Sequence, residues 1–518
     1  MPAPSRILSL AAAAALCTAH NSQTPLNAPG ASTELQLEAV EMPGLSDYAT
    51  KPIVDSQMLQ DSIKIKTLYK RAEHLYQIAK LSEPEFNHPT RVIGSKGHDA
   101  TRKYIIDTLE SLGGYYNVST QDFPVVMSHV YESRLVIGDV VSKSARPMGL
   151  TPPTKNNQPV FGRVTLAKNN GCSPSDYASD VKGSIVLIER GACSFADKSI
   201  QAGRAGAATA VIYNTDDGEL NGSLTEATDD MVATFGIDGK EGQQFVEKFK
   251  RSTSPLDGIT YVDSEVNKFS TTNIIAQTAN GDADNCVMLG GHSDSVGAGP
   301  GINDDGSGSL TTLEIAVQLS KFRVNNCVRL AWWSAEEEGL WGSSFYAKSL
   351  SPEENQKVRL FMDYDMLASP NFAYQIYNST NDNNPAGSEE LRDLYIKFYK
   401  DNGLKYTFIP FDGRSDYVGF LRSGIPSGGI ATGAEGIKTK EEEKMFGGKA
   451  GDWYDPAYHQ LEDDVGNLNL TAWEINSKLV AHSVGTYARS FKDYPKRVAS
   501  AATASQQEFK YRGGSLIM

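Results

Sequence analysis

The sequence predicts an α/β protein whose mostly parallel central sheet is flanked by helices and interrupted by a small β-rich insert. After residue 273, strand-like apolar runs alternate with segments of helical spacing, over 286–289, 309–322, 328–333, 343–350 and 358–364. Such alternation favours a parallel sheet, because the chain must cross over between parallel strands. Between about 130 and 262, short β-type runs are instead separated by clusters of Gly, Asn and Asp.

The first helices of the α/β domain are expected ahead of this insert. Apolar residues recur at helical spacing over 56–80 and again over 98–112, where two glycines follow as a stop signal. The strand-like runs of the insert are 133–137, 160–166, 184–188 and 208–213. We therefore expect a discontinuous α/β domain over 61–130 and 265–495, with the insert over 131–264.

The N-terminus has the pattern of a secretory signal peptide over residues 1–19. Arg6 precedes an apolar run over 7–17, and small residues follow it. We expect residues 20–60 to form a propeptide or a loose arm, and 496–518 a poorly ordered tail. No later segment approaches the roughly 18 apolar residues that a membrane span needs. The sequence therefore predicts a secreted protein without a membrane anchor, with the vacuole as the alternative.

The charge balance argues against two classes of partner. The chain has 49 Lys and Arg against 63 Asp and Glu, which gives a net charge of −14. Nucleic acids and anionic membranes both bind cationic surfaces. We expect neither as a partner, and we expect a monomer.

The cysteines fit an oxidising compartment. Removal of the signal peptide takes away Cys17 and leaves four of the five cysteines, which allow three pairings. Cys286 and Cys327 each open a predicted strand in the context Asn-Cys-Val. If those strands are parallel neighbours in register, the two cysteines come within disulfide distance; two buried thiols are the alternative. Four glycosylation sequons are also compatible with secretion, at Asn117, Asn221, Asn378 and Asn469.

Potential metal ligands follow three successive predicted strands. They are His292 with Asp304 and Asp305, then Glu336 with Glu337, then Asp363 with Asp365. In open α/β sheets, ligands gather at the carboxyl ends of strands. Histidine and carboxylates without a thiol suit zinc. Of two adjacent glutamates, one can bind the metal while the other takes a proton from activated water.

Four ordered motifs resemble the two-zinc aminopeptidases of the vacuolar aminopeptidase Y and secreted fungal leucine aminopeptidase type. They are GHSDSVGAGPGINDDGSG, AEEEGLWGS, DYDM and DPAYHQLEDD, preceded by a further similar segment, RVIGSKGHDA. The resemblance covers about residues 60–495. It implies the zinc exopeptidase fold and two Zn²⁺ per chain. Asp304 would bridge both ions, His292 and Asp365 would bind one, and Glu337 and His459 the other.

The same resemblance implies the remaining site residues. Glu336 would be the general base and Tyr458 would stabilise the oxyanion. Arg414 and Asp416, in the segment GRSDY, would lie near the substrate amine. The peptide bond between Asp304 and Asp305 would be cis.

Residues 181–214 resemble a protease-associated domain, which usually forms a lid or rim beside a catalytic cleft. This likeness implies a Cys172–Cys193 disulfide; a purely structural lobe is the alternative role for the insert.

The predicted function is therefore that of a zinc aminopeptidase acting on peptide or protein N-termini, with a preference for apolar residues such as Leu. A carboxypeptidase of the same superfamily would need a basic pocket, and no Arg cluster is evident. A glutaminyl cyclase would hold one zinc. A non-enzymatic receptor ectodomain of this arrangement would lack metal ligands and carry a membrane anchor.

Overall fold

The computed structural model describes residues 48–497 except 216, 217, 219, 221, 225–227 and 381–383. The predicted signal peptide, the sequon at Asn221 and the tail from residue 498 lie outside the described residues. Within the described part of the chain, no helix combines the length and the apolar character needed to cross a bilayer.

The centre of the fold is a sheet whose inner strands are parallel. In spatial order they are β14 (Ser427–Ala431), β11 (Val358–Tyr364), β9 (Asp282–His292) and β10 (Asn326–Trp333). Beyond β14 follow β12 (Gln375–Tyr377) and β13 (Thr407–Ile409), and beyond β10 follow the antiparallel β8 (Asp257–Thr278) and β1 (Tyr116–Ile137). The inner strands are buried along most of their length, which explains their continuous apolar sequences.

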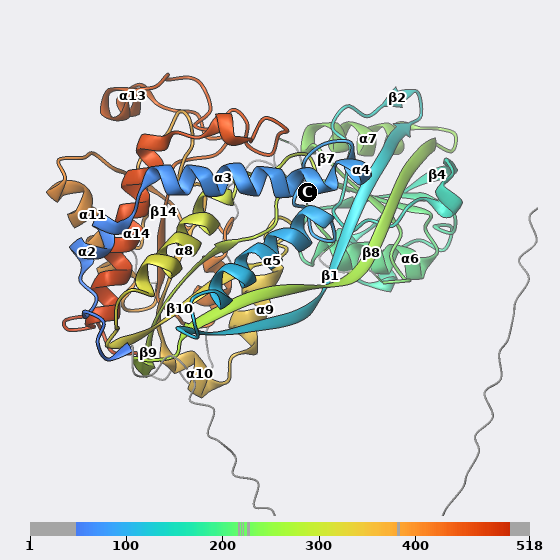
Figure 1. Ribbon diagram of the computed structural model, residues 1–518. Helices are drawn as coiled ribbons and strands as arrows, with labels where there is room; N and C mark the ends of the chain where they lie inside the picture. The colour runs from blue at the N-terminus through green and yellow to red at the C-terminus, as the bar shows by residue number, and fades with distance from the viewer. Residues whose placement is uncertain are drawn as a thin grey trace, which may run out of the picture. The chain divides into compact units, whose positions relative to one another are not determined.

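Helices cover both faces of this sheet (Figure 1). Because strand residues alternate between faces, Leu289 and Leu330 belong to one core and Met288 and Phe361 to another. The first core is completed by helices α3 (Ile65–Ala79), α5 (Lys96–Glu110), α8 (Gly306–Leu319), α11 (Ser388–Asp401) and α14 (Leu470–Arg489). The second is completed by α9 (Trp341–Ser349) and α12 (Tyr417–Arg422). Shorter helices are α2 (Ser56–Ser62), α4 (Glu83–Phe86), α10 (Pro352–Lys357) and α13 (Lys440–Phe446).

The inserted module has its own mostly parallel sheet. Its parallel strands are β4 (Val160–Leu166), β5 (Ile185–Glu189), β6 (Thr209–Tyr213) and β7 (Ala233–Ile237), and β3 (Arg146–Pro147) lies antiparallel at the edge. The short strand β2 (Val140–Val141) pairs instead with β1. Helices α6 (Phe195–Ala205) and α7 (Gly239–Arg251) pack against it. The predicted small β-rich insert is therefore present, and it also contains two helices between its strands.

Two 22-residue strands connect the module to the central sheet. β1 and β8 pair antiparallel from Tyr116 opposite Thr278 to Ile137 opposite Gly258. One end of β8 pairs with β10 of the central sheet and the other end with β4 of the module. Figure 1 shows the two strands running side by side into the module.

The predicted helix over 56–80 is two helices. Asp55 caps α2 by accepting hydrogen bonds from the backbone of Gln57 and Met58, and the chain becomes extended at Ile63 before α3 begins. Val54 and Leu59 are fully buried in the core that contains α14. The loose arm predicted over 20–60 therefore does not extend to residue 60.

The four cysteines outside the predicted signal peptide form two disulfides in the structure, Cys172–Cys193 and Cys286–Cys327. The second joins β9 to its parallel neighbour β10, where Val287 lies opposite Val328, and its Cα atoms are 4.5 Å apart.

Of the described sequon asparagines, Asn117 is exposed on β1 and Asn378 is partly buried. Asn469 caps α14 by accepting a hydrogen bond from the Ala472 N–H.

Candidate metal centre

The carboxyl ends of three neighbouring strands carry the predicted ligands. His292 is the last residue of β9, Glu336 and Glu337 follow β10, and Asp365 follows β11. Asp304 lies just ahead of α8, in the loop that leaves β9. Because β9 lies between β10 and β11, their ends meet at one edge of the sheet.

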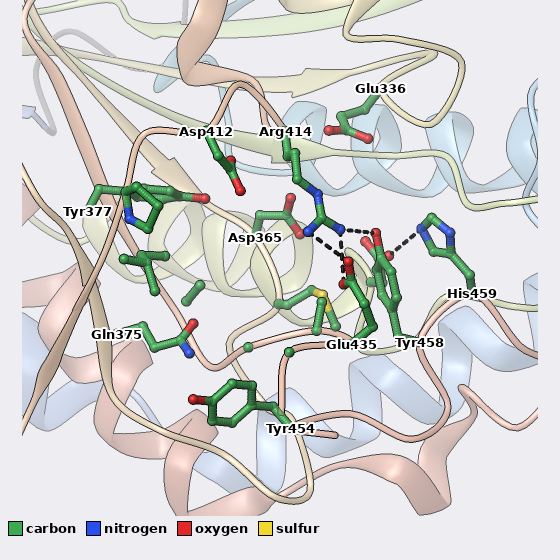
Figure 2. A pocket seen from close by; sticks show the side chains of 18 of the residues that line it. Glu336, Asp365, Gln375, Tyr377, Asp412, Arg414, Glu435, Tyr454, Tyr458 and His459 are labelled. Atoms are coloured by element: carbon green, nitrogen blue, oxygen red, sulfur yellow. Dashed lines mark hydrogen bonds and ion pairs between the residues drawn. The ribbon is translucent and has the colours of Figure 1, made fainter. Parts of the chain in front are cut away.

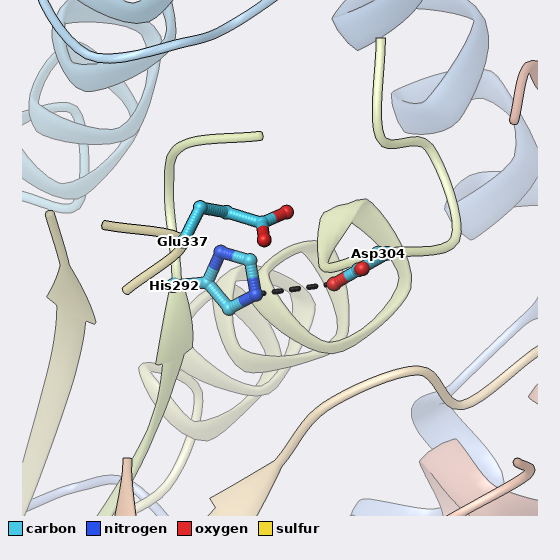
Figure 3. Close-up of side chains that lie close together, drawn as sticks. All are labelled: His292, Asp304 and Glu337. Atoms are coloured by element: carbon cyan, nitrogen blue, oxygen red, sulfur yellow. Dashed lines mark ion pairs between the residues drawn. The ribbon is translucent and has the colours of Figure 1, made fainter. Parts of the chain in front are cut away.

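The two oxygens of Asp304 face two different histidines. Asp304 Oδ1 is 3.2 Å from His292 Nε2, and Asp304 Oδ2 is 3.2 Å from His459 Nε2. Figure 3 shows His292 and Glu337 on the same side of Asp304. Glu337 Oε2 lies 3.1 Å from His459 Nε2, while Asp365 Oδ1 lies 3.9 Å from His292 Nε2. The five predicted ligands therefore form two groups that share Asp304.

The cluster fits bound cations. His292 Nε2 and Asp365 Oδ1 are buried and have no hydrogen-bond partner among the described residues. Burial raises the pKa of Asp365 to about 7, and the charge of Asp304 adds to the shift. Burial alone would lower the pKa of His459, but Glu337 and Asp304 outweigh it and raise the value to about 10. The site thus attracts positive charge, and imidazole nitrogens with carboxylate oxygens suit zinc.

Two further aspartates orient the ligands. The ring of His292 contacts Asp294, with Nδ1 3.2 Å from the backbone oxygen, which leaves Nε2 facing Asp304. Asp305 accepts hydrogen bonds from the backbone N–H groups of His292, Gly308 and Met366. Asp305 thereby ties the ends of β9 and β11 to the start of α8. Its peptide bond with Asp304 is cis, as the resemblance implies.

The loop ahead of Asp304 is held by two more buried charges. Asp463 accepts hydrogen bonds from the backbone N–H groups of Asn303 and Asp304 at 2.9 and 3.0 Å. Arg91 is fully buried and donates to the carbonyl oxygens of Pro300 and Gly301. Sequence reasoning gave Asp463 and Arg91 no role, although both lie inside motifs that carry the resemblance. The presence of a charged residue inside such a motif could have indicated that it supports the site.

Three residues at or next to the predicted ligands have a strained backbone. His459 itself has a φ of 58°, Ala335 before Glu336 has 60°, and Met366 after Asp365 has 54°. Non-glycine residues with positive φ cost of order 1–3 kcal/mol each and persist where surrounding contacts enforce them. Packing therefore imposes the direction in which these side chains leave the backbone.

A cavity of about 220 Å³ opens beside the cluster (Figure 2). Its other lining residues include Met366, Gln375, Tyr377, Ile409, Pro410 and Tyr454. Glu336 lines the cavity, and its carboxylate makes no hydrogen bond to the described residues. Burial raises the pKa of the Glu336 carboxyl above its usual value. The ring of Tyr458 stacks on His459 with 3.8 Å between centroids. The predicted metal ligands Asp304, Glu337, Asp365 and His459 thus line the same cavity as several apolar side chains.

The two residues predicted near the substrate amine lie at different depths. Arg414 lines the cavity and forms a two-pronged ion pair with Glu435, which sequence reasoning missed. Asp416 is fully buried at the start of α12 and is not among the lining residues. Contact of Asp416 with a substrate stays a prediction.

Comparison with known proteins decides the family. The description "peptidase family M28" matches residues 273–484. Aminopeptidase Y of Saccharomyces cerevisiae is 46% identical over 91% of this chain and 88% of that protein. The chain belongs to peptidase family M28. This M28 peptidase is also 42% identical to leucine aminopeptidase 2 of Trichophyton equinum, over 90% of the chain and 92% of the relative.

Two further comparisons concern the architecture of the M28 peptidase. The PA domain description matches residues 160–245, which confirms the predicted insertion of a protease-associated domain into the α/β domain. The solved aminopeptidase from Aneurinibacillus sp. strain AM-1 superimposes with a TM-score of 0.66 at 26% identity, over 86% of this chain and 98% of that one.

Proposed function

We propose that this M28 peptidase is an aminopeptidase that removes N-terminal residues from peptides and proteins with the help of two zinc ions. One observation carries the proposal: the oxygens of Asp304 face His292 and His459 separately, and Asp304 and His459 line a cavity. His292, Asp304 and Asp365 would hold one ion, and Asp304, Glu337 and His459 the other. The names of the relatives, aminopeptidase Y and leucine aminopeptidase 2, support the reaction class.

Glu336 acts as the general base. Bound zinc ions supply Lewis-acid polarisation of the scissile carbonyl and lower the pKa of water. The Glu336 carboxylate lines the cavity and has no hydrogen-bond partner in the described part of the chain, whereas Glu337 accepts a hydrogen bond from the Val296 backbone N–H. Glu336 takes a proton from the attacking water and later delivers it to the leaving amine.

Tyr458 and the carboxylates orient the substrate. The Tyr458 hydroxyl donates a hydrogen bond to the carbonyl oxygen as negative charge develops there. The cationic α-amino group of the substrate binds among the carboxylates, which favours free N-termini. The first side chain then enters the chamber, where Met366, Ile409 and Pro410 favour an apolar residue such as Leu.

A carboxypeptidase is the less favoured alternative. It would need an unpaired cation for the C-terminal carboxylate, and Arg414, the only Arg or Lys among the residues lining the described cavity, is paired with Glu435.

We further propose that the chain enters the secretory pathway and acts outside the cell or in the vacuole as a monomer.

Peptide pairs that differ only at the N-terminus test this function. We expect hydrolysis of Leu-containing peptides with a free α-amine and none of their N-acetylated forms, because acetylation removes the charge that the carboxylates bind. Mass spectrometry of the products reads the result. Cleavage of acetylated peptides, or removal of residues from the C-terminus, would contradict the proposal. Loss of ammonia from an N-terminal Gln without hydrolysis would instead identify a cyclase.

A further inference from the structure

Glu435 is tied to the cavity by an ion pair with Arg414. It lies in the loop after β14, whereas Arg414 lies in the loop ahead of α12. Arg414 Nη1 is 2.9 Å from Glu435 Oε1, and Arg414 Nη2 is 3.0 Å from Glu435 Oε2. Both side chains are about three-quarters buried, with exposed fractions of 25% and 28%. The guanidinium thus contacts both oxygens of one carboxylate, with a hydrogen bond from Nη2, and such a two-point contact fixes the plane and direction of a guanidinium.

The same guanidinium reaches the Tyr458 hydroxyl. Arg414 Nη2 is 3.2 Å from the Tyr458 oxygen, and dashed lines in Figure 2 join the Arg414 guanidinium to both Glu435 and Tyr458. Arginine only donates hydrogen bonds, so the Tyr458 oxygen must accept this one. The hydroxyl proton of Tyr458 then has to point away from Arg414. The described residues provide no other hydrogen-bond partner for this hydroxyl, and Tyr458 lines the cavity.

We propose that Glu435 is a positioning residue that acts through Arg414 to hold the Tyr458 hydroxyl as a hydrogen-bond donor toward the substrate carbonyl. The inference rests on the proposed aminopeptidase function and adds a residue to it. Without Glu435, Arg414 can turn away, and the Tyr458 hydroxyl no longer has a fixed direction. A donor that must reorganise during the reaction stabilises developing charge less than a preorganised one. The loss should therefore appear in kcat and not in ground-state binding.

A double-mutant cycle tests this inference. The variants are Glu435→Ala, Tyr458→Phe and the pair combined, assayed with a leucine p-nitroanilide. We expect Glu435→Ala to lower kcat about tenfold, roughly the effect of one weakened hydrogen bond, with KM nearly unchanged. Tyr458→Phe should lower kcat about 100-fold, as for loss of one oxyanion donor. The combined variant should be no slower than Tyr458→Phe, because Glu435 then has no hydroxyl to position.

Two controls separate positioning from loss of structure. Glu435→Gln keeps an oxygen that accepts from Arg414 and should recover part of the lost kcat. Glu441→Ala, at an exposed residue of the nearby helix α13, should leave kcat unchanged. Thermal melting of each variant reports on folding independently of activity.

The outcomes distinguish this inference from the proposed function. A combined variant several times slower than Tyr458→Phe would overturn the inference, and so would a Glu435→Ala loss confined to KM. Failure of Glu435→Gln to recover activity while it melts like the wild type would also overturn it. In each of these cases the wild type still cleaves free N-termini. A wild-type protein that spares free N-termini would instead contradict the proposed function.

Discussion

Replacing Glu336 with glutamine is expected to lower kcat by about 10²–10⁴-fold, the range that general acid–base catalysis contributes. Glutamine keeps the shape of the side chain but cannot accept the proton of the attacking water. Because Glu336 is not one of the five proposed ligands, the zinc content of the variant should equal that of the wild type. Steady-state kinetics with a Leu peptide and elemental analysis of the same samples measure both quantities.

The zinc content makes this experiment decisive about the role of Glu336. His292, Glu336 and Asp365 also lie close enough together to hold one ion. If Glu336 were a ligand, Glu336→Gln would lose zinc together with activity, and the assignment of a general base would be contradicted. Glu338→Gln is the matched control. It changes the third glutamate of the same run, which does not line the cavity, and should keep most of the activity.

Replacing Asp304 with asparagine is expected to abolish both activity and tight zinc binding. Each oxygen of Asp304 faces a different histidine, at 3.2 Å in both cases. Asparagine offers one neutral oxygen and an NH2 group, so one centre loses an oxygen ligand and the other keeps only an uncharged one. Changes merely in the groups around a metal ligand cost about 10–100-fold in affinity, so loss of a ligand should cost more. Equilibrium dialysis against zinc measures the affinity.

The matched control for this variant is Asp284→Asn, an exposed aspartate near the start of the same strand β9. It should leave zinc affinity and kcat unchanged. An Asp304→Asn protein that retains two tightly bound zinc ions would show that Asp304 does not bridge them.

The inner strands, and the places of the proposed ligands at their ends, could be predicted because local sequence determines them. β11 is buried on both faces, and its apolar run gives its bounds directly. His292, Glu337 and Asp365 each end or closely follow such a run. His459 follows no strand and has a positive φ within a loop. Only its motif indicated a ligand, because its position depends on tertiary packing.

The long strands and the residues outside the motifs could not be predicted, for a physical reason in each case. β1 and β8 pair over 22 residues each, but exposed positions interrupt much of their length, so their apolar signal is weak. Residues 53–59 are too few to show a clear helical pattern, and the burial of Val54 and Leu59 depends on α14, more than 400 positions later. The pairing of Arg414 with Glu435 joins two loops that meet only in the folded chain.

The proposed function depends on two zinc ions held through the one shared carboxylate of Asp304. Elemental analysis of the purified protein, combined with diffraction recorded at the zinc absorption edge, tests this directly. We predict two zinc ions per chain with anomalous peaks on either side of Asp304. We further predict that a chelator removes both ions together with activity and that added zinc restores them. A fully active protein with one zinc ion per chain, or with none at Asp304, would contradict the shared site.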